Sequence, residues 1–119
     1  MTDVQDILRS LGITRCYKGF KHTEYAVLLA VQNESHLEAV AKEIYMETAN
    51  YFECHWTAVE RNIRTAVARA WRTNRPLLCE MAGYPLGKEP SASEFIEIIA
   101  SYIIRSSQPQ SNLRPFAVP

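Results

Sequence analysis

A run of arginines spaced along residues 56–72 carries the side chains of this chain that are best suited to bind a charged partner. At 100° per residue, one side of the run is apolar and the other holds cations and small residues. The apolar side comprises Val59, Ile63, Ala66, Val67, Ala70 and Trp71, and the opposite side comprises Arg61, Arg64, Thr65, Ala68 and Arg72. The pattern predicts an amphipathic helix, with Thr57 as N-cap and Glu60 completing a capping box.

This basic face suits the major groove of B-DNA, which admits one helix. A guanidinium fork matches the two acceptors of guanine, and a carboxylate can accept from the amino group of cytosine. Glu60 also precedes Arg64 by four residues, which favours a supporting ion pair. The alternative is an ordinary solvated helix face, because arginine is a good helix former. Periodicity alone leaves both interpretations open.

The residues before the basic helix strengthen the first interpretation. A second amphipathic helix is predicted from about Ser35 to Phe52, and Glu53-Cys54-His55 forms a short turn between the two. Two helices joined by a short turn, the second one basic, describe a helix-turn-helix. Ala49 is small enough for close helix packing, whereas Glu53 is a poor residue for a left-handed turn.

The rest of the chain also predicts helices. A first helix ends near Leu11, before Gly12, and residues 13–20 read as a connector. Tyr25 to Val31 is apolar nearly all round and predicts a central helix capped by Thr23. Residues 76–81 form a short helix, and a Ser91–Glu94 capping box begins the last one. We expect an all-α bundle of about six helices over residues 1–106, followed by a disordered polar tail over residues 107–119.

Composition limits the classes of function. Of the 119 residues, 47% are hydrophobic and the formal net charge is zero, so any binding of a polyanion must come from a local patch. Residues 57–75 supply one, with five arginines against one glutamate. The three cysteines are widely spaced without a CxxC pair, which indicates neither a zinc site nor a disulfide framework. We expect no cofactor and no metal, a cytoplasmic chain and no membrane span.

Two short patterns that could suggest an enzyme are rejected. Residues 83–89 resemble a phosphate loop but have the wrong glycine spacing, and Glu89 replaces its Ser/Thr. Cys54 and His55 are adjacent, and neighbouring side chains on a turn usually point apart. His22 and His36 are expected on the surface at helix starts. The chain is therefore not expected to be an enzyme.

The order of several short motifs resembles the DNA-binding effector domain of the stage-zero sporulation response regulator of spore-forming bacteria. The resemblance covers about residues 3–105. Its most specific part is Val59-Glu60-Arg61 with Ile63-Arg64, then Ala70-Trp71, then Ser93-Glu94-Phe95-Ile96; Leu11-Gly12-Ile13, Lys18-Gly19-Phe20, Ile44-Tyr45 and Thr48-Ala49 also match.

The resemblance implies a sequence-specific transcription regulator that reads a short promoter box in double-stranded DNA. It also implies a homodimer on DNA and a contact with RNA polymerase. The base-reading residues would be Glu60, Arg61 and Arg64. Contacts to the DNA backbone are expected from Thr57, Thr65, Arg72, Lys88 and Ser93. Dimerisation is expected through Ile98, Tyr102 and Ile104, because the last helix carries a wider apolar arc than one core needs.

Several residues depart from the family pattern. The family commonly has Arg at the position of Ala58, Asn at that of Ala92 and Pro at that of Met46. The phosphoacceptor receiver domain of the family is also missing. Either this protein naturally lacks a receiver domain, or the chain is a part of a longer protein that has one. These departures motivate an alternative function: a protein-interaction module of the same fold that has lost specific DNA binding and pairs with a related regulator.

Overall fold

The computed structural model describes residues 4–14, 18–32 and 41–107 of the chain. The described part is all-α, as predicted, and contains no strand. Its helices are α1 (Val4–Ser10), α2 (Lys18–Gln32), α4 (Ala41–Phe52), α5 (Trp56–Thr73), α6 (Arg75–Ala82) and α7 (Ala92–Ser107). Over these residues, no helix combines the length and apolar character that crossing a bilayer requires.

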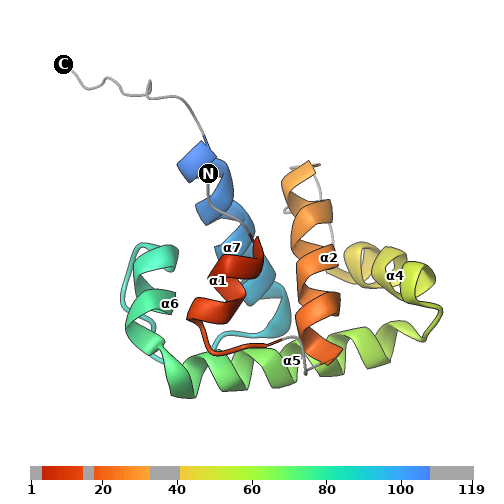
Figure 1. The fold of residues 1–119 in the computed structure, drawn as a ribbon, viewed down its shortest axis with the longest axis horizontal. Coiled ribbons are helices and arrows are strands. Elements are labelled where there is room, and N and C mark those ends of the chain that lie inside the picture. Colours follow the sequence, from red (N-terminus) through yellow and green to blue (C-terminus); the bar gives the residue numbers. More distant parts are fainter. Residues whose placement is uncertain (1–3, 15–17, 33–40, 108–119) are drawn as a thin grey trace.

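Helix α5 forms the base on which the other helices stand (Figure 1). Helices α2 and α7 rise from its middle, α4 packs at its N-terminal end, and α6 turns upward after its C-terminal end. One long face of α5 therefore lies against the rest of the molecule. The face on the far side lies along the lower edge of the view.

The apolar stripe of α5 is buried, as its periodicity predicts. Val59, Ile63, Val67 and Ala70 are all fully buried, and Trp71 is half-buried. They join one core with residues from α1, α2 and α7, including Leu8, Phe20, Phe95 and Ile99. Burial of such side chains typically contributes about 1.5–3 kcal/mol each, which fixes the rotation of α5 about its own axis. The polar side of α5 is thereby turned outward.

Gly19 sets the spacing between α2 and α5. A Cβ atom at this position would lie 3.2 Å from the Cβ of Ala66 and 3.3 Å from the carbonyl carbon of Asn62, and closer still to its oxygen. The two helices can approach this closely only because glycine has no side chain. The first turn of α2 is consequently held directly against α5.

Three predicted boundaries were wrong. Helix α2 begins at Lys18, inside the predicted connector, so Thr23 is a fully buried residue of the helix and does not cap it. His55, and not Thr57, caps α5: its Nδ1 atom accepts a hydrogen bond from the Thr57 amide at 3.3 Å. The N-cap must precede the first turn, and Thr57 is already the second residue of α5. Ser107, placed in the tail, is the last residue of α7.

Other local predictions are confirmed. Gly83 ends α6 in the left-handed conformation with φ 89°, and Gly12 has φ 86° after α1. The capping box at α7 is present: the Ser91 amide donates to Glu94 Oε1 at 2.8 Å, and the Glu94 amide donates to Ser91 Oγ at 3.2 Å. The predicted start of the helix before α5, His36 and the tail beyond Ser107 lie outside the described residues.

Candidate DNA-binding site

Helices α4 and α5 form the predicted helix-turn-helix. The turn places Glu53 in the left-handed region with φ 56°, the conformation that its residue type disfavours. Backbone hydrogen bonds close the turn, from the Glu53 amide to the Asn50 oxygen at 3.3 Å and from the Cys54 amide to the Ala49 oxygen at 2.9 Å. Ala49 is 3% exposed, so the two helices pack closely at this point, as its small size predicts.

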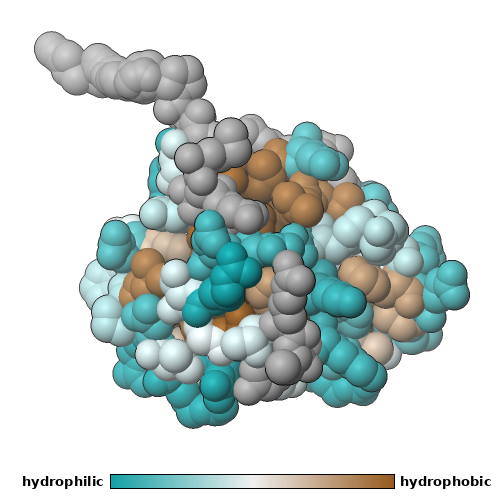
Figure 2. All heavy atoms as spheres, viewed as in Figure 1, coloured by the Kyte–Doolittle hydropathy of each residue, from teal (hydrophilic) through white to brown (hydrophobic). Residues whose placement is uncertain are grey.

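The outward face of α5 carries the predicted cations. Arg61, Arg64 and Arg72 are exposed, as are Thr57 and Thr65. Between them, the small residues Ala58 and Ala68 are half-buried and add little bulk. Figure 2 shows a largely hydrophilic lower edge of the molecule, where this face lies. The surface is thus open to a partner over several turns of the helix.

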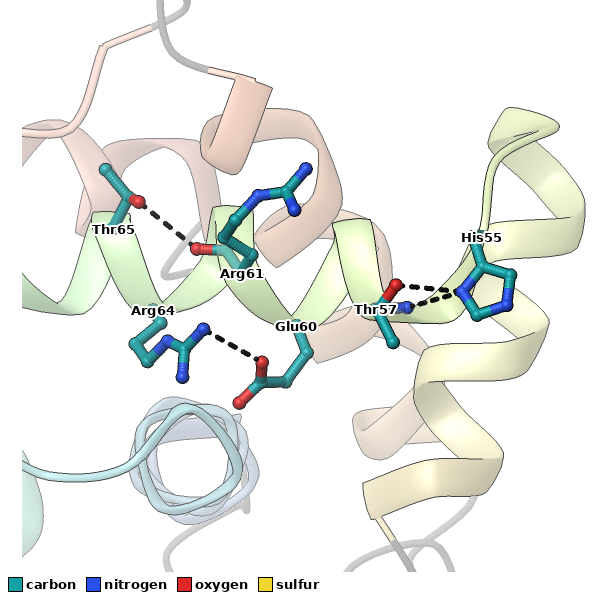
Figure 3. A network of polar contacts seen from close by, with 6 residues as sticks. All are labelled: His55, Thr57, Glu60, Arg61, Arg64 and Thr65. Atoms are coloured by element: carbon teal, nitrogen blue, oxygen red, sulfur yellow. Dashed lines mark hydrogen bonds and ion pairs between the residues drawn. The ribbon is translucent and has the colours of Figure 1, made fainter.

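Glu60 and Arg64 lie together on one flank of α5, and Arg61 and Thr65 lie on the other (Figure 3). Arg64 Nη2 is 3.4 Å from Glu60 Oε1, and the two side chains are 58% and 31% exposed. The predicted i,i+4 ion pair is therefore confirmed. An exposed pair of this kind contributes at most about 1 kcal/mol, so either group can exchange its partner for an incoming ligand.

Arg61 has no hydrogen-bond or ion-pair partner for its guanidinium group among the described residues. Its carbonyl oxygen accepts from Thr65 Oγ1 at 3.1 Å, which orients the threonine along the helix (Figure 3). Over the part of the chain that the structure describes, the five N–H donors of Arg61 are consequently available to an external acceptor.

Tyr45 of α4 lies near enough to Glu60 and Arg64 for their charges to act on its hydroxyl group. It is 6% exposed. Burial and, to a smaller extent, the Glu60 carboxylate raise the pKa of Tyr45 to about 12, while the positive charge of Arg64 acts in the opposite direction. The tyrosine therefore stays neutral at physiological pH and adds no charge near the ion pair.

Two other arginines of the basic run contact the protein itself. Arg69 Nε donates to the Gly12 oxygen at 3.1 Å and so ties α5 to the segment after α1. The guanidinium carbon of Arg75 lies 4.1 Å from the ring centroid of Trp71, a cation–π contact. Periodicity did not separate these structural arginines from Arg61, Arg64 and Arg72.

The predicted backbone contacts outside α5 lie around the start of α7. Lys88 is exposed in the loop that follows α6. Ser93 is half-buried in the first turn of α7, with its Oγ 3.2 Å from Ser91 Oγ. Ala92, where the family commonly has Asn, is 3% exposed, so this position packs against the core.

The three residues expected to mediate dimerisation do not form one surface. Ile98 is only 8% exposed in the single chain and belongs to its core. Tyr102 and Ile104 are half-buried. At 100° per residue their side chains leave α7 about 160° apart. The apolar arc is wide because α7 packs against α2 and α6 as well as α5, which the sequence pattern does not show.

A basic hollow beside α5 was missed. It has a volume of about 350 Å³, and its lining includes Lys18 and Lys21 of α2 together with Ala58, Arg61 and Asn62 of α5. Lys18 was placed in a connector and Lys21 at an unassigned position, and no pattern of residues near them in the sequence indicates that a helix begins there.

His22 forms part of the same hollow, and its prediction as a surface residue was wrong. It is 7% exposed, and its Nδ1 atom lies 3.3 Å from Asn62 Nδ2. Its ring lies 4.9 Å from that of Phe52. Burial, and to a smaller extent the charge of Lys18, lower the pKa of His22 below its ordinary value. The neutral ring can then accept from the Asn62 amide.

A helix-turn-helix whose second helix is basic and exposed defines a DNA-binding domain of the helix-turn-helix class. The comparison with known families agrees: the family model described as "Sporulation initiation factor Spo0A C terminal" matches residues 4–103, nearly all of the described chain. The chain therefore belongs to this family, whose members are DNA-binding effector domains of a sporulation regulator.

Proposed function

We propose that this chain is a sequence-specific transcription regulator that reads a short promoter box through the outward face of α5. In this proposal, Glu60, Arg61 and Arg64 contact base edges in the major groove. The residues that position the domain on the sugar–phosphate backbone are Thr57, Thr65, Arg72, Lys88 and Ser93. Acting on chromosomal DNA would place the chain in the cytoplasm of a bacterium.

The free guanidinium group of Arg61 carries this proposal. It projects from a helix whose rotation the core fixes, and it has no partner among the described residues that DNA would have to displace. The guanidinium fork is planar and rigid in itself, so it loses less conformational freedom per hydrogen bond when it binds the two acceptors of a guanine. Glu60 and Arg64 differ from it, since they must first exchange their mutual contact.

The test is an equilibrium titration of the chain with two duplexes, one selected from a random library by the wild-type chain and one with the same bases scrambled. Arg61→Ala should weaken binding to the selected duplex by about 1–3 kcal/mol, roughly 5- to 150-fold, with a much smaller effect on the scrambled one. Thr65→Ala is the matched variant on the same flank. As a phosphate contact, Thr65 should affect both duplexes equally.

An equal loss on both duplexes for Arg61→Ala would make Arg61 a backbone contact and contradict its role in base reading. A wild-type chain that binds neither duplex at low salt, even at about 10 µM, would instead support the interaction module, because non-specific binding alone usually reaches that range.

We further propose that the domain binds DNA as a homodimer and contacts RNA polymerase from there. Tyr102 belongs to the predicted dimer surface. Its side chain is half-buried and packs against the core, so part of it stays accessible to a second subunit. Sedimentation of Tyr102→Glu with and without the selected duplex tests this surface. A complex of the same mass as that of the wild type would exclude it.

A further inference from the structure

The basic hollow beside α5 contains two lysines to which the proposed function assigns no role. Three cationic side chains line it, Lys18 and Lys21 from the first turns of α2 and Arg61 from α5. Its other lining residues are His22, Phe52, Cys54, Ala58 and Asn62, so no acid lines it among the residues that the structure describes. Both lysines are exposed, and neither has a partner for its ammonium group among the described residues.

Three cations around one concave surface favour the binding of an anion. Like charges that share one concave surface repel each other, and low-dielectric walls strengthen the field between them. The neutral state of His22 beneath them is consistent with this field, since Lys18 contributes to its lowered pKa. An anion entering the hollow would relieve the repulsion of all three cations together.

The contact between the two helices places the three cationic residues around one hollow. Gly19, between the lysines in sequence, allows α2 to contact the backbone of α5 at Asn62. The Asn62–His22 contact at 3.3 Å joins the same two helices at the hollow. The small side chain of Ala58 leaves the space open. The lysines are thus held at one flank of α5, on the side of Arg61.

We propose that the hollow binds a phosphate group of the DNA backbone, with Lys18 and Lys21 as positioning residues for α5. This inference rests on the proposed function. A helix lying in the major groove has a sugar–phosphate strand along each side, so cations at the flank of α5 would meet the strand next to the base that Arg61 reads. The phosphate would fix how deeply and at what angle α5 enters the groove.

Salt dependence of binding gives the first test, measured for Lys18→Ala and Lys21→Ala on the selected and scrambled duplexes. Each variant should reduce the slope of log K against log salt concentration by about one on both duplexes, while the preference between them stays unchanged. Arg9→Ala removes the same charge from α1, where Arg9 pairs with Asp6 outside the hollow, and should leave the slope unchanged. Equal urea midpoints would establish that the variants fold alike.

Neutral methylphosphonates, substituted one at a time in the selected duplex, give the second test. One position should weaken wild-type binding but leave Lys21→Ala unaffected, because the variant has already lost that contact. The phosphate site is wrong if the lysine variants keep the wild-type salt slope and if their loss of binding free energy simply adds to that of every methylphosphonate. In that case an Arg61-dependent base preference would still support the proposed function. A wild-type chain that binds neither duplex would overturn both.

Discussion

Replacing Gly19 by alanine tests whether the close contact between α2 and α5 is as tight as the structure indicates. The new Cβ would overlap the Asn62 carbonyl group and sit 3.2 Å from the Cβ of Ala66. Carbon atoms pack best about 3.5–4.0 Å apart, so α2 must withdraw by roughly 1 Å. Both helices are anchored in the core, and a backbone carbonyl cannot turn aside as a flexible side chain can.

Two opposing terms set the size of the effect. Overpacking costs about 1–3 kcal/mol, and a clash with backbone belongs at the upper end of that range. Alanine recovers at most about 1 kcal/mol of helix propensity, and less in the first turn of a helix. We expect a net loss of about 2 kcal/mol in the free energy of unfolding, or roughly 8–16 °C in Tm.

Urea unfolding followed by circular dichroism measures this difference. Gly87→Ala is the matched control, because its Cβ would meet nothing within 4 Å, and its stability should change by less than about 0.5 kcal/mol. A Gly19→Ala variant as stable as the wild type, or more stable, would refute the reasoning: helix propensity would then outweigh the contact, and α2 could not be held tightly against α5.

Three further substitutions test local features of the fold. Glu53→Gly should raise the free energy of unfolding by about 0.5–1 kcal/mol, because φ 56° strains a residue with a Cβ; an unchanged urea midpoint would argue against strain. His55→Ala should lower it by about 1 kcal/mol through loss of the α5 cap, detected as a lower midpoint. The pKa of His22 is lower in the folded chain than in the unfolded one. The free energy of unfolding should therefore be highest above about pH 6.5 and fall as the solution becomes more acidic, because protonation then favours the unfolded chain. His22→Gln should flatten that dependence, and an equally steep loss in the variant would exclude His22 as its source.

The helix-turn-helix could be predicted from the sequence because its signals are local. The stripe from Val59 to Ala70 repeats at the helical period, and its burial follows from that repeat alone. The turn at Glu53 and the capping box at Ser91 also depend on residues within a few positions of one another. The family match over residues 4–103 agrees with the predicted class of protein and with its all-α fold.

The errors arose where contacts distant in sequence decide the outcome. Nothing near Lys18 indicates that α2 begins there, since the close approach that Gly19 permits involves Asn62, far along the chain. His22 looked exposed because its partners, Asn62 and Phe52, belong to other helices. The burial of Ile98 could not be predicted either, because the periodicity of one helix does not show how many other helices it contacts.

The base preference of Arg61, resolved position by position, tests the central claim most directly. The wild-type chain and Arg61→Ala would each be titrated with the selected duplex and with every single-base-pair replacement of it. We expect the variant to lose its discrimination at one base pair, by about 1–3 kcal/mol, and to keep the wild-type profile elsewhere. A profile lowered evenly at all positions would show that α5 contacts the DNA without reading its sequence through Arg61.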